Sequence, residues 1–184
     1  QGLYALHRRL RGHDLAADLV RLAVIHYGSG TAGFASPPAG LEQFTVPVLQ
    51  PGSGDHASLS LALGTLTLAL EREKTPGVPS DHKPVALLLS ANVPDAGWDV
   101  ARQELRYHPL NLIAIGCGSW ADLTVLQQVG DAALRMADVT PDHLRVTLDW
   151  FAALVEGACE FVAQGESGNF RVPRVPREAG LRLV

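Results

Sequence analysis

The chain has 184 residues, of which 47% are hydrophobic and 18% are charged. That apolar content can bury a sizeable core and excludes disorder over most of the length. The formal net charge of -4 argues against nucleic acid as a partner, and two cysteines are too few for a disulfide scaffold or a cysteine zinc site. No apolar run reaches the roughly 18 residues of a membrane-spanning helix. We therefore expect a cytoplasmic protein with reduced, buried thiols and no membrane partner.

The first half of the chain predicts two helices and two strands. Residues 3–15 have the pattern of an amphipathic helix, and residues 19–27 predict a strand that ends before a glycine-rich segment. The proline and glycine content of residues 31–56 predicts a short edge strand near Gly33-Phe34, followed by a long loop. Residues 59–70 predict a helix, because a helical stripe of leucines continues where strand alternation fails.

The second half alternates short apolar runs with helical patterns, the order of an α/β domain with a mostly parallel sheet. We expect strands at 85–89, 110–116 and 134–139, the last at a sheet edge, and helices at 95–108, at 119–130 with Ser119 as N-cap, and from Pro141 to about Val162. Residues 164–184 are rich in proline and arginine. They predict a tail, a linker or a docking arm.

The segment from Gly28 to Gly33 reads GSGTAG, which matches the G-x-G-x-x-G pattern of dinucleotide-binding loops. That chemistry requires a helix to begin there, so that its N-terminal amides can hold the pyrophosphate. Pro37 and Pro38 follow too soon for such a helix. We favour a glycine-rich turn between two strands, and a nucleotide-binding oxidoreductase is the less favoured alternative.

Two further segments have candidate chemistry. The stretch Gly52–Ser58 contains hydroxyls and a carboxylate that suit a cation or an anion, but a capping loop in which Asp55 or Ser58 accepts helix N–H bonds is the simpler interpretation. Cys117 follows a predicted buried strand and is a candidate nucleophile for a hydrolase. A small side chain in the core is the favoured interpretation of that residue.

Together these landmarks resemble a von Willebrand factor A (vWA) domain, in particular the bacterial TerY-like branch of the tellurium-resistance type. The resemblance rests on five segments: LVRLAVIHYGSGTAGF, PVLQPGSGDHASLSLAL, KPVALLLSANVPDAGWDVA, NLIAIGCGSWADLTVLQQVGD and VTPDHLRVTLDWFAALV. They are similar to the family's second strand and hairpin, the loop before its next helix, the strand and loop that normally read T-D-G-x-P, the fifth-strand region and the closing helix.

The resemblance implies a Rossmann-like α/β fold, with a mostly parallel central sheet and helices on both faces. It covers residues 1–163, which we expect to form an N-terminally incomplete vWA-like domain, and it leaves 164–184 as the tail or linker. The family's central first strand would precede Gln1. Without it the strands at 20–27 and 85–89 would lose their shared neighbour, so we expect the chain to resume at Gln1 rather than to begin there.

The family's known chemistry is a metal-ion-dependent adhesion site, in which an Asp-x-Ser-x-Ser motif, a Thr and an Asp hold Mg²⁺. At the position that the resemblance assigns to that Asp, this chain has Ala91, and the Thr position falls on Ala57 or His56. Alanine has no ligand atom, and a neutral imidazole suits Mg²⁺ poorly. We expect a degenerate site with no metal or other cofactor. Mg²⁺ is possible only if an intact motif precedes Gln1.

The resemblance therefore implies a non-catalytic protein–protein interaction domain that binds a protein partner through the loops at the C-terminal ends of its strands. The residues that we expect to contact the partner are Ser53, Asp55, His56, Ser58, Ser90, Asn92 and Asp95. A scaffold role inside a homo- or hetero-oligomer is also open. The alternatives are a Mg²⁺-dependent adhesion or assembly module with residual metal binding and, from a different class, an enzyme that uses Gly28–Gly33 or Cys117.

Overall fold

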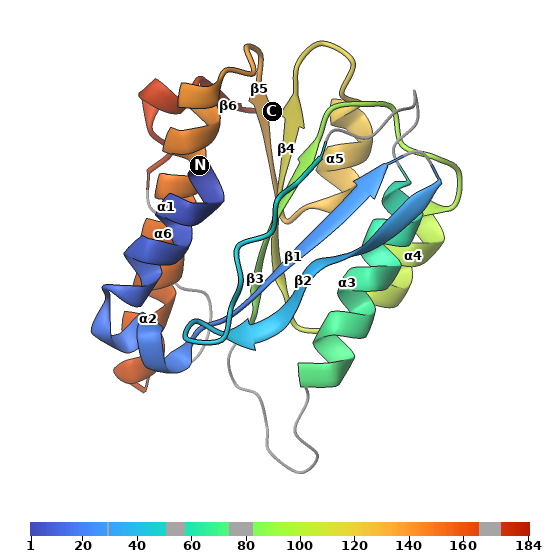
Figure 1. The fold of residues 1–184 in the computed structure, drawn as a ribbon. Coiled ribbons are helices and arrows are strands. Elements are labelled where there is room, and N and C mark those ends of the chain that lie inside the picture. Colours follow the sequence, from blue (N-terminus) through green and yellow to red (C-terminus); the bar gives the residue numbers. More distant parts are fainter. Residues whose placement is uncertain (29, 51–57, 74–82, 166–173) are drawn as a thin grey trace.

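The computed structural model describes residues 1–28, 30–50, 58–73, 83–165 and 174–184. Strands form a central layer between two layers of helices (Figure 1). The N-terminal half contains α1 (Gly2–Arg11), α2 (Asp14–Leu19), β1 (Arg21–Gly28), β2 (Thr31–Gly40) and α3 (Leu59–Glu73). The remainder contains β3 (Val85–Ser90), α4 (Trp98–Leu105), β4 (Asn111–Cys117), α5 (Leu123–Val129), β5 (Ala132–Met136), α6 (Pro141–Ala163), the short 3-10 helix η1 (Arg177–Ala179) and β6 (Leu181–Leu183).

The central layer consists of two separate sheets. One is the antiparallel pair β1-β2, and the other has the order β3-β4-β5-β6. In the second sheet β3, β4 and β5 are parallel, and β6 pairs antiparallel with β5. The expected α/β class, with helices on both faces of the strands, is confirmed, but no hydrogen-bonded ladder joins β1 to β3.

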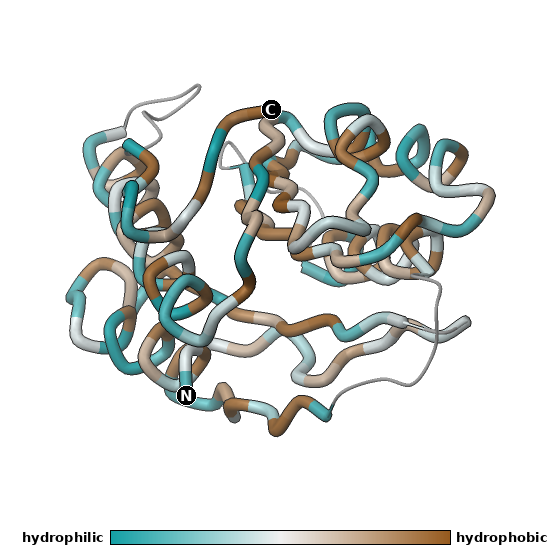
Figure 2. Tube along the Cα trace, turned by 90° about the horizontal axis from the view of Figure 1, so that it is seen from above, coloured by the Kyte–Doolittle hydropathy of each residue, from teal (hydrophilic) through white to brown (hydrophobic). Residues whose placement is uncertain are grey.

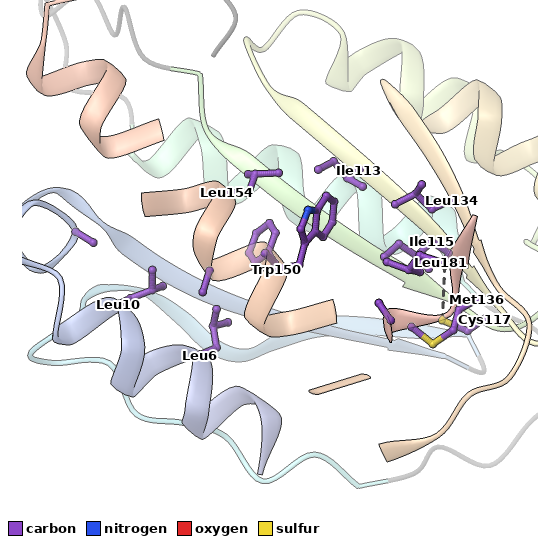
Figure 3. Close-up of a cluster of buried hydrophobic side chains, with 14 of the residues drawn as sticks. Leu6, Leu10, Ile113, Ile115, Cys117, Leu134, Met136, Trp150, Leu154 and Leu181 are labelled. Atoms are coloured by element: carbon purple, nitrogen blue, oxygen red, sulfur yellow. Dashed lines mark hydrogen bonds between the residues drawn. The ribbon is translucent and has the colours of Figure 1, made fainter. Parts of the chain in front are cut away.

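Helices α1, α2 and α6 cover one face of the strands, and α3, α4 and α5 cover the other (Figure 1). In Figure 2 apolar and polar residues alternate along the helices, as expected of helices that bury one side. The larger core cluster joins α1 and α6 to the β4 and β5 side chains and includes Leu10, Ile115, Met136 and Leu154 (Figure 3). The smaller cluster joins α3, α4 and α5 to the opposite face of the sheet.

The best-defined helix in the sequence, α6, begins as predicted. The Thr140 side chain accepts a 3.1 Å hydrogen bond from the His143 amide, and Pro141 occupies the first helical turn. The predicted cap of α5 is wrong. Asp122, rather than Ser119, accepts a hydrogen bond from the Val125 amide. The carboxylate lies one residue before the helix, and this is where a capping acceptor reaches the free N–H groups.

Several predicted boundaries in the N-terminal half shift. A second helix, α2, follows α1 after a break at Gly12, where the single predicted helix was expected to end near residue 15. The edge strand β2 is longer than expected and continues through Pro37 and Pro38 to Gly40. An edge strand tolerates proline because one of its sides has no ladder to donate to.

The last residues of the segment 164–184, which we predicted to be a tail, a linker or a docking arm, form a strand. Leu181–Leu183 pair with β5, so β5 is not the edge strand that we predicted. Ala179 and Leu181 are buried in the larger core cluster. Proline and arginine content predicted a tail, a linker or a docking arm without a place in the sheet, whereas two buried apolar side chains and the pairing with β5 attach the last residues to the domain.

The N-terminal helix is fastened to the domain by charge as well as by packing. The Arg9 guanidinium bonds both carboxylate oxygens of Glu156, at 2.8 and 2.6 Å, and also contacts Asp149 on the same helix. Bidentate pairing of this kind fixes orientation better than a single ion pair does. Within the described part of the chain, no helix combines the length and the apolar character that crossing a membrane requires.

Candidate partner-binding site

One edge of the domain brings together segments that are far apart in the chain. We call it the loop face. It comprises the β1–β2 turn, the start of α3, and the loops at 91–97 and 118–122 that follow β3 and β4. The carboxyl ends of neighbouring parallel strands share an edge, so the β3 and β4 loops lie there together. Two side-chain hydrogen bonds then attach the start of α3 to its neighbours.

The first bond joins the start of α3 to the β1–β2 turn. The Gly30 amide donates a 2.7 Å hydrogen bond to the Ser58 hydroxyl oxygen. Ser58 directly precedes α3 and is only 3% exposed. Gly30 has a φ of +77°, a conformation that a two-residue hairpin turn often requires. Ser58 therefore holds the turn in place instead of offering its hydroxyl to solvent.

The second bond joins the start of α3 to the loop that follows β3. The Asp95 carboxylate accepts hydrogen bonds from the Ser60 amide, at 3.1 Å, and from the Ser60 hydroxyl, at 2.5 Å. Ser60 lies in the first turn of α3, where backbone amides lack helical partners and a negative charge is favourable. We predicted that Asp55 or Ser58 would accept such bonds. In the described residues a carboxylate from another loop does so.

A third contact crosses from β1 to β3. The Tyr27 hydroxyl donates a 2.7 Å hydrogen bond to the Leu89 carbonyl oxygen. Burial raises the pKa of Tyr27 to about 12, although the neighbouring Ser90 hydroxyl lowers it in part. Ser90 is 2% exposed, and among the described residues its hydroxyl has no partner of good hydrogen-bonding geometry.

The predicted contact residues therefore divide into three groups. Ser53, Asp55 and His56 lie outside the described residues. Ser58 and Ser90 are buried, and Asn92 and Asp95 are half-buried in the loop after β3. Because Asp95 is committed to Ser60, Asn92 is the described candidate with an accessible side chain and no such internal role.

Sequence reasoning overlooked two apolar side chains on the same face. Trp120, in the loop after β4, is 78% exposed, and Val93, in the loop after β3, is 53% exposed. Tryptophan is among the residues that most often dominate the energy of protein interfaces. The signal was present in the sequence, since Trp120 stands in a loop between a buried strand and a capped helix, but pattern analysis treated it as part of the helix.

The enzyme alternatives fit the structure poorly. The segment from Gly28 to Gly33 forms the end of β1, a tight turn and the start of β2, so no helix begins where a pyrophosphate would need one. Cys117 is buried in the core (Figure 3), and that burial raises its pKa to about 11. A nucleophilic cysteine needs the opposite, an accessible thiolate near neutral pH.

The described residues also do not fit a divalent cation at the loop face. Both carboxylate oxygens of Asp95 accept bonds from Ser60, and Ala91 contributes no ligand atom. In the ranges that the structure describes, no three His, Cys, Asp or Glu side chains gather as a metal site would require. Oxygen-rich coordination of Mg²⁺ would need donors that this part of the chain does not supply.

Comparison with solved structures finds proteins of similar fold. Proximal thread matrix protein 1 from the mussel byssus superposes with a TM-score of 0.55 at 16% identity, over 84% of this chain and 42% of that one. The same protein with a zinc-occupied MIDAS motif gives a TM-score of 0.52 at 15% identity, over 84% and 43%. No family model matches the sequence, and no curated protein matches it. The chain thus has a vWA-like fold and spans less than half of the length of these neighbours.

Proposed function

We propose that this chain is a non-catalytic protein-interaction module that binds a protein partner through the loop face, without a bound metal. The observation that carries the proposal is that Trp120 and Val93 are both exposed on the loop face, where the Asp95–Ser60 and Gly30–Ser58 bonds fix the loop after β3 and the β1–β2 turn. A rigid frame lowers the entropy lost on binding, and an exposed tryptophan supplies the apolar contact area.

The fold supports the same proposal in a general way. The solved neighbours described above are structures of one matrix protein, and one of these structures has zinc in the MIDAS motif. Metal dependence does not transfer with a fold at this level of identity. For this chain we propose binding without metal, because Asp95 already bonds Ser60 and Ala91 lacks a donor.

The test compares three baits in affinity capture from the source organism: the unaltered chain, Trp120→Ala and Tyr107→Ala. Tyr107 is a matched control because it is also an exposed aromatic residue, at 86%, but it precedes β4 and so lies at the opposite edge of the sheet. We expect the captured partner, once purified, to bind Trp120→Ala at least about tenfold more weakly and Tyr107→Ala unchanged. Equal affinity for all three baits would refute the loop-face proposal.

The metal claim has its own measurement. Binding of the purified partner is measured with Mg²⁺ and with EDTA, and we expect the two dissociation constants to agree. Loss of binding in EDTA, restored by added Mg²⁺, would show that the interaction depends on metal. That result would overturn the metal-free part and leave the loop-face part standing.

A further inference from the structure

Helix α3 carries no charge over its first three turns. Residues 59–70 read LSLALGTLTLAL, and the first charged residue of the helix is Glu71. A helix that faces solvent on one side normally has charged or polar residues on that side, whereas a helix that is apolar all round is normally buried. Part of α3 is nevertheless exposed, so its outer side is the surface to account for.

Two leucines stand on that outer side. The domain itself buries Leu59, Ala62, Leu63 and Ala69. Leu61 and Leu68, in contrast, are 47% and 52% exposed. Residues seven apart lie within about 20° of each other around a helix, so the two leucines point the same way.

The residues between these leucines add little polarity. The Thr65 hydroxyl donates a 2.8 Å hydrogen bond to the Leu61 carbonyl oxygen, one turn earlier in the helix, so its donor is already used. A Cβ on Gly64 would meet nothing within 4 Å, which shows open space beside that residue. We call Leu61, Gly64, Thr65 and Leu68 the α3 stripe. At the end of the stripe, the Arg72 guanidinium is turned onto β2, where it lies 5.9 Å from the centre of the Phe34 ring.

The α3 stripe is complementary to itself. Leu61 and Leu68 are equally far from the midpoint between Gly64 and Thr65. A second α3 that crosses the first in antiparallel orientation therefore packs Leu61 against the partner's Leu68, twice over. The two small residues in the middle let the helix axes approach each other, and a two-fold interface requires the same patch on both copies. An unrelated helix would need this leucine spacing by coincidence, whereas a second copy always has it.

Charge favours the same occupant. The formal net charge of -4 makes two copies repel each other, but the α3 stripe brings no charge of either sign into the contact. Glu71 lies in the last turn of α3, where the dipole of its own helix disfavours a carboxylate. Antiparallel pairing moves Glu71 toward the N-terminal end of the partner's helix, where a negative charge is favourable.

We infer that the α3 stripe is the interface of a two-fold homodimer, in which the α3 helices of two copies cross antiparallel at Gly64 and Thr65. Two helices that meet at one crossing bury less than the roughly 800 Å² per partner of a standard interface. The dimer is therefore weak and depends on concentration. It does not require the loop-face proposal, so Trp120→Ala, which tests that proposal, should leave dimerisation unchanged.

The first test is sedimentation of the full chain from micromolar to millimolar concentration. We expect the average mass to rise toward that of a dimer, and Leu68→Glu to raise the dissociation constant at least about tenfold, because it puts a carboxylate against the partner's Leu61. Leu19→Glu is the matched control, since Leu19 is 50% exposed on α2, in the opposite helix layer (Figure 1). Circular dichroism checks that both variants fold. A monomer at every concentration, or equal effects of the two substitutions, would overturn the inference.

The second test locates the crossing with introduced cysteines. Thr65→Cys should form a disulfide with its own copy under mild oxidation, because the two-fold axis passes beside it. Leu61→Cys should link to separately prepared Leu68→Cys but not to itself, since the two copies of residue 61 lie about 10 Å apart along the axis and a disulfide spans less than about 7 Å between Cα atoms. The native Cys117 and Cys159 are buried and do not compete. Self-linking of Leu61→Cys as fast as its linking to Leu68→Cys, or no linking of Thr65→Cys, would overturn the antiparallel interface.

Discussion

Asp95 and Ser60 are 35 residues apart in the chain, yet the carboxylate of one accepts hydrogen bonds from both the amide and the hydroxyl of the other. This pair connects the loop after β3 to the first turn of α3. Asp95 thereby supplies the hydrogen-bond acceptor that the first turn of α3 needs. The same pair also determines how the loop face is held.

Replacing Asp95 with alanine should destabilise the domain by about 1–2 kcal/mol, the usual effect of losing a capping acceptor at a helix N-terminus. Ser60→Ala should reduce the free energy of unfolding by less, because the hydrogen bond from the backbone amide of residue 60 remains and only the one from the hydroxyl is lost. Chemical denaturation measures both. Asp18→Ala, at an exposed position of α2, is the control and should change the free energy of unfolding by less than about 0.5 kcal/mol. An Asp95→Ala variant as stable as the control would mean that the pair does not support α3.

The raised pKa of Tyr27 predicts that the folded chain loses stability at high pH. Its pKa is about 12 in the folded chain, above the value of about 10 in an unfolded one, so the folded state holds this proton more tightly. The resulting stabilisation is complete below about pH 10 and disappears as the pH rises toward 12. From the size of the shift it is on the order of 2–3 kcal/mol.

The measurement is the free energy of unfolding against pH for the unaltered chain and for Tyr27→Phe. At pH 7 the variant should be less stable by about 1 kcal/mol, because it lacks the bond to Leu89. Between pH 10 and 12 the unaltered chain should lose stability faster, and the difference should shrink or reverse. Cys117 is present in both proteins, so its own titration contributes to both curves. Parallel curves over this range would contradict the prediction.

Cys117 should be unreactive in the folded protein. With a pKa of about 11, roughly one thiol in a thousand is ionised at pH 8, and its side chain is buried in the core. A thiol reagent should label it only after unfolding, whereas a small accessible thiol labels within minutes. Cys159→Ala removes the other buried thiol, so that a single signal is followed. Rapid labelling of that variant under native conditions would reopen the nucleophile interpretation.

Replacing either of two glycines with alanine should change the stability of the domain, but in opposite directions. A Cβ on Gly116 in β4 would lie 2.5 Å from a methyl carbon of Leu123, so Gly116→Ala should destabilise the domain by about 1–3 kcal/mol. A Cβ on Gly64 in α3 would meet nothing within 4 Å. Gly64→Ala should therefore stabilise the helix by about 0.5–1 kcal/mol. Thermal unfolding of the two variants measures both effects. A rise in Tm for both would show that the packing around Gly116 accommodates the added methyl group, and a fall in both would contradict the prediction for Gly64.

The sequence was most informative where local chemistry determines the structure. Thr140 and Pro141 correctly predict the start of α6, and the apolar run at Val85–Leu89 correctly predicts β3. It was least informative where distant residues decide. The cap from Asp95 comes from another loop, and β6 exists because β5 offers it an edge. At the candidate site the polar residues were chosen from the loops that the resemblance assigns to the binding surface. Their burial, which removes Ser58 and Ser90 from direct contact with a partner, depends on packing that no local pattern encodes.

The outer edges of the two sheets differ from the inner ones in how they resist self-association. At one end β6 has only three residues, and its middle residue is Arg182, while at the other end β2 contains Pro37 and Pro38. Short length, charge and proline are the features by which natural sheets avoid growing into fibres. The inner edge of β3, at Val85–Leu89, has none of these features. Of the sheet edges that the structure describes, it is therefore the one that most needs a neighbouring strand to cover it.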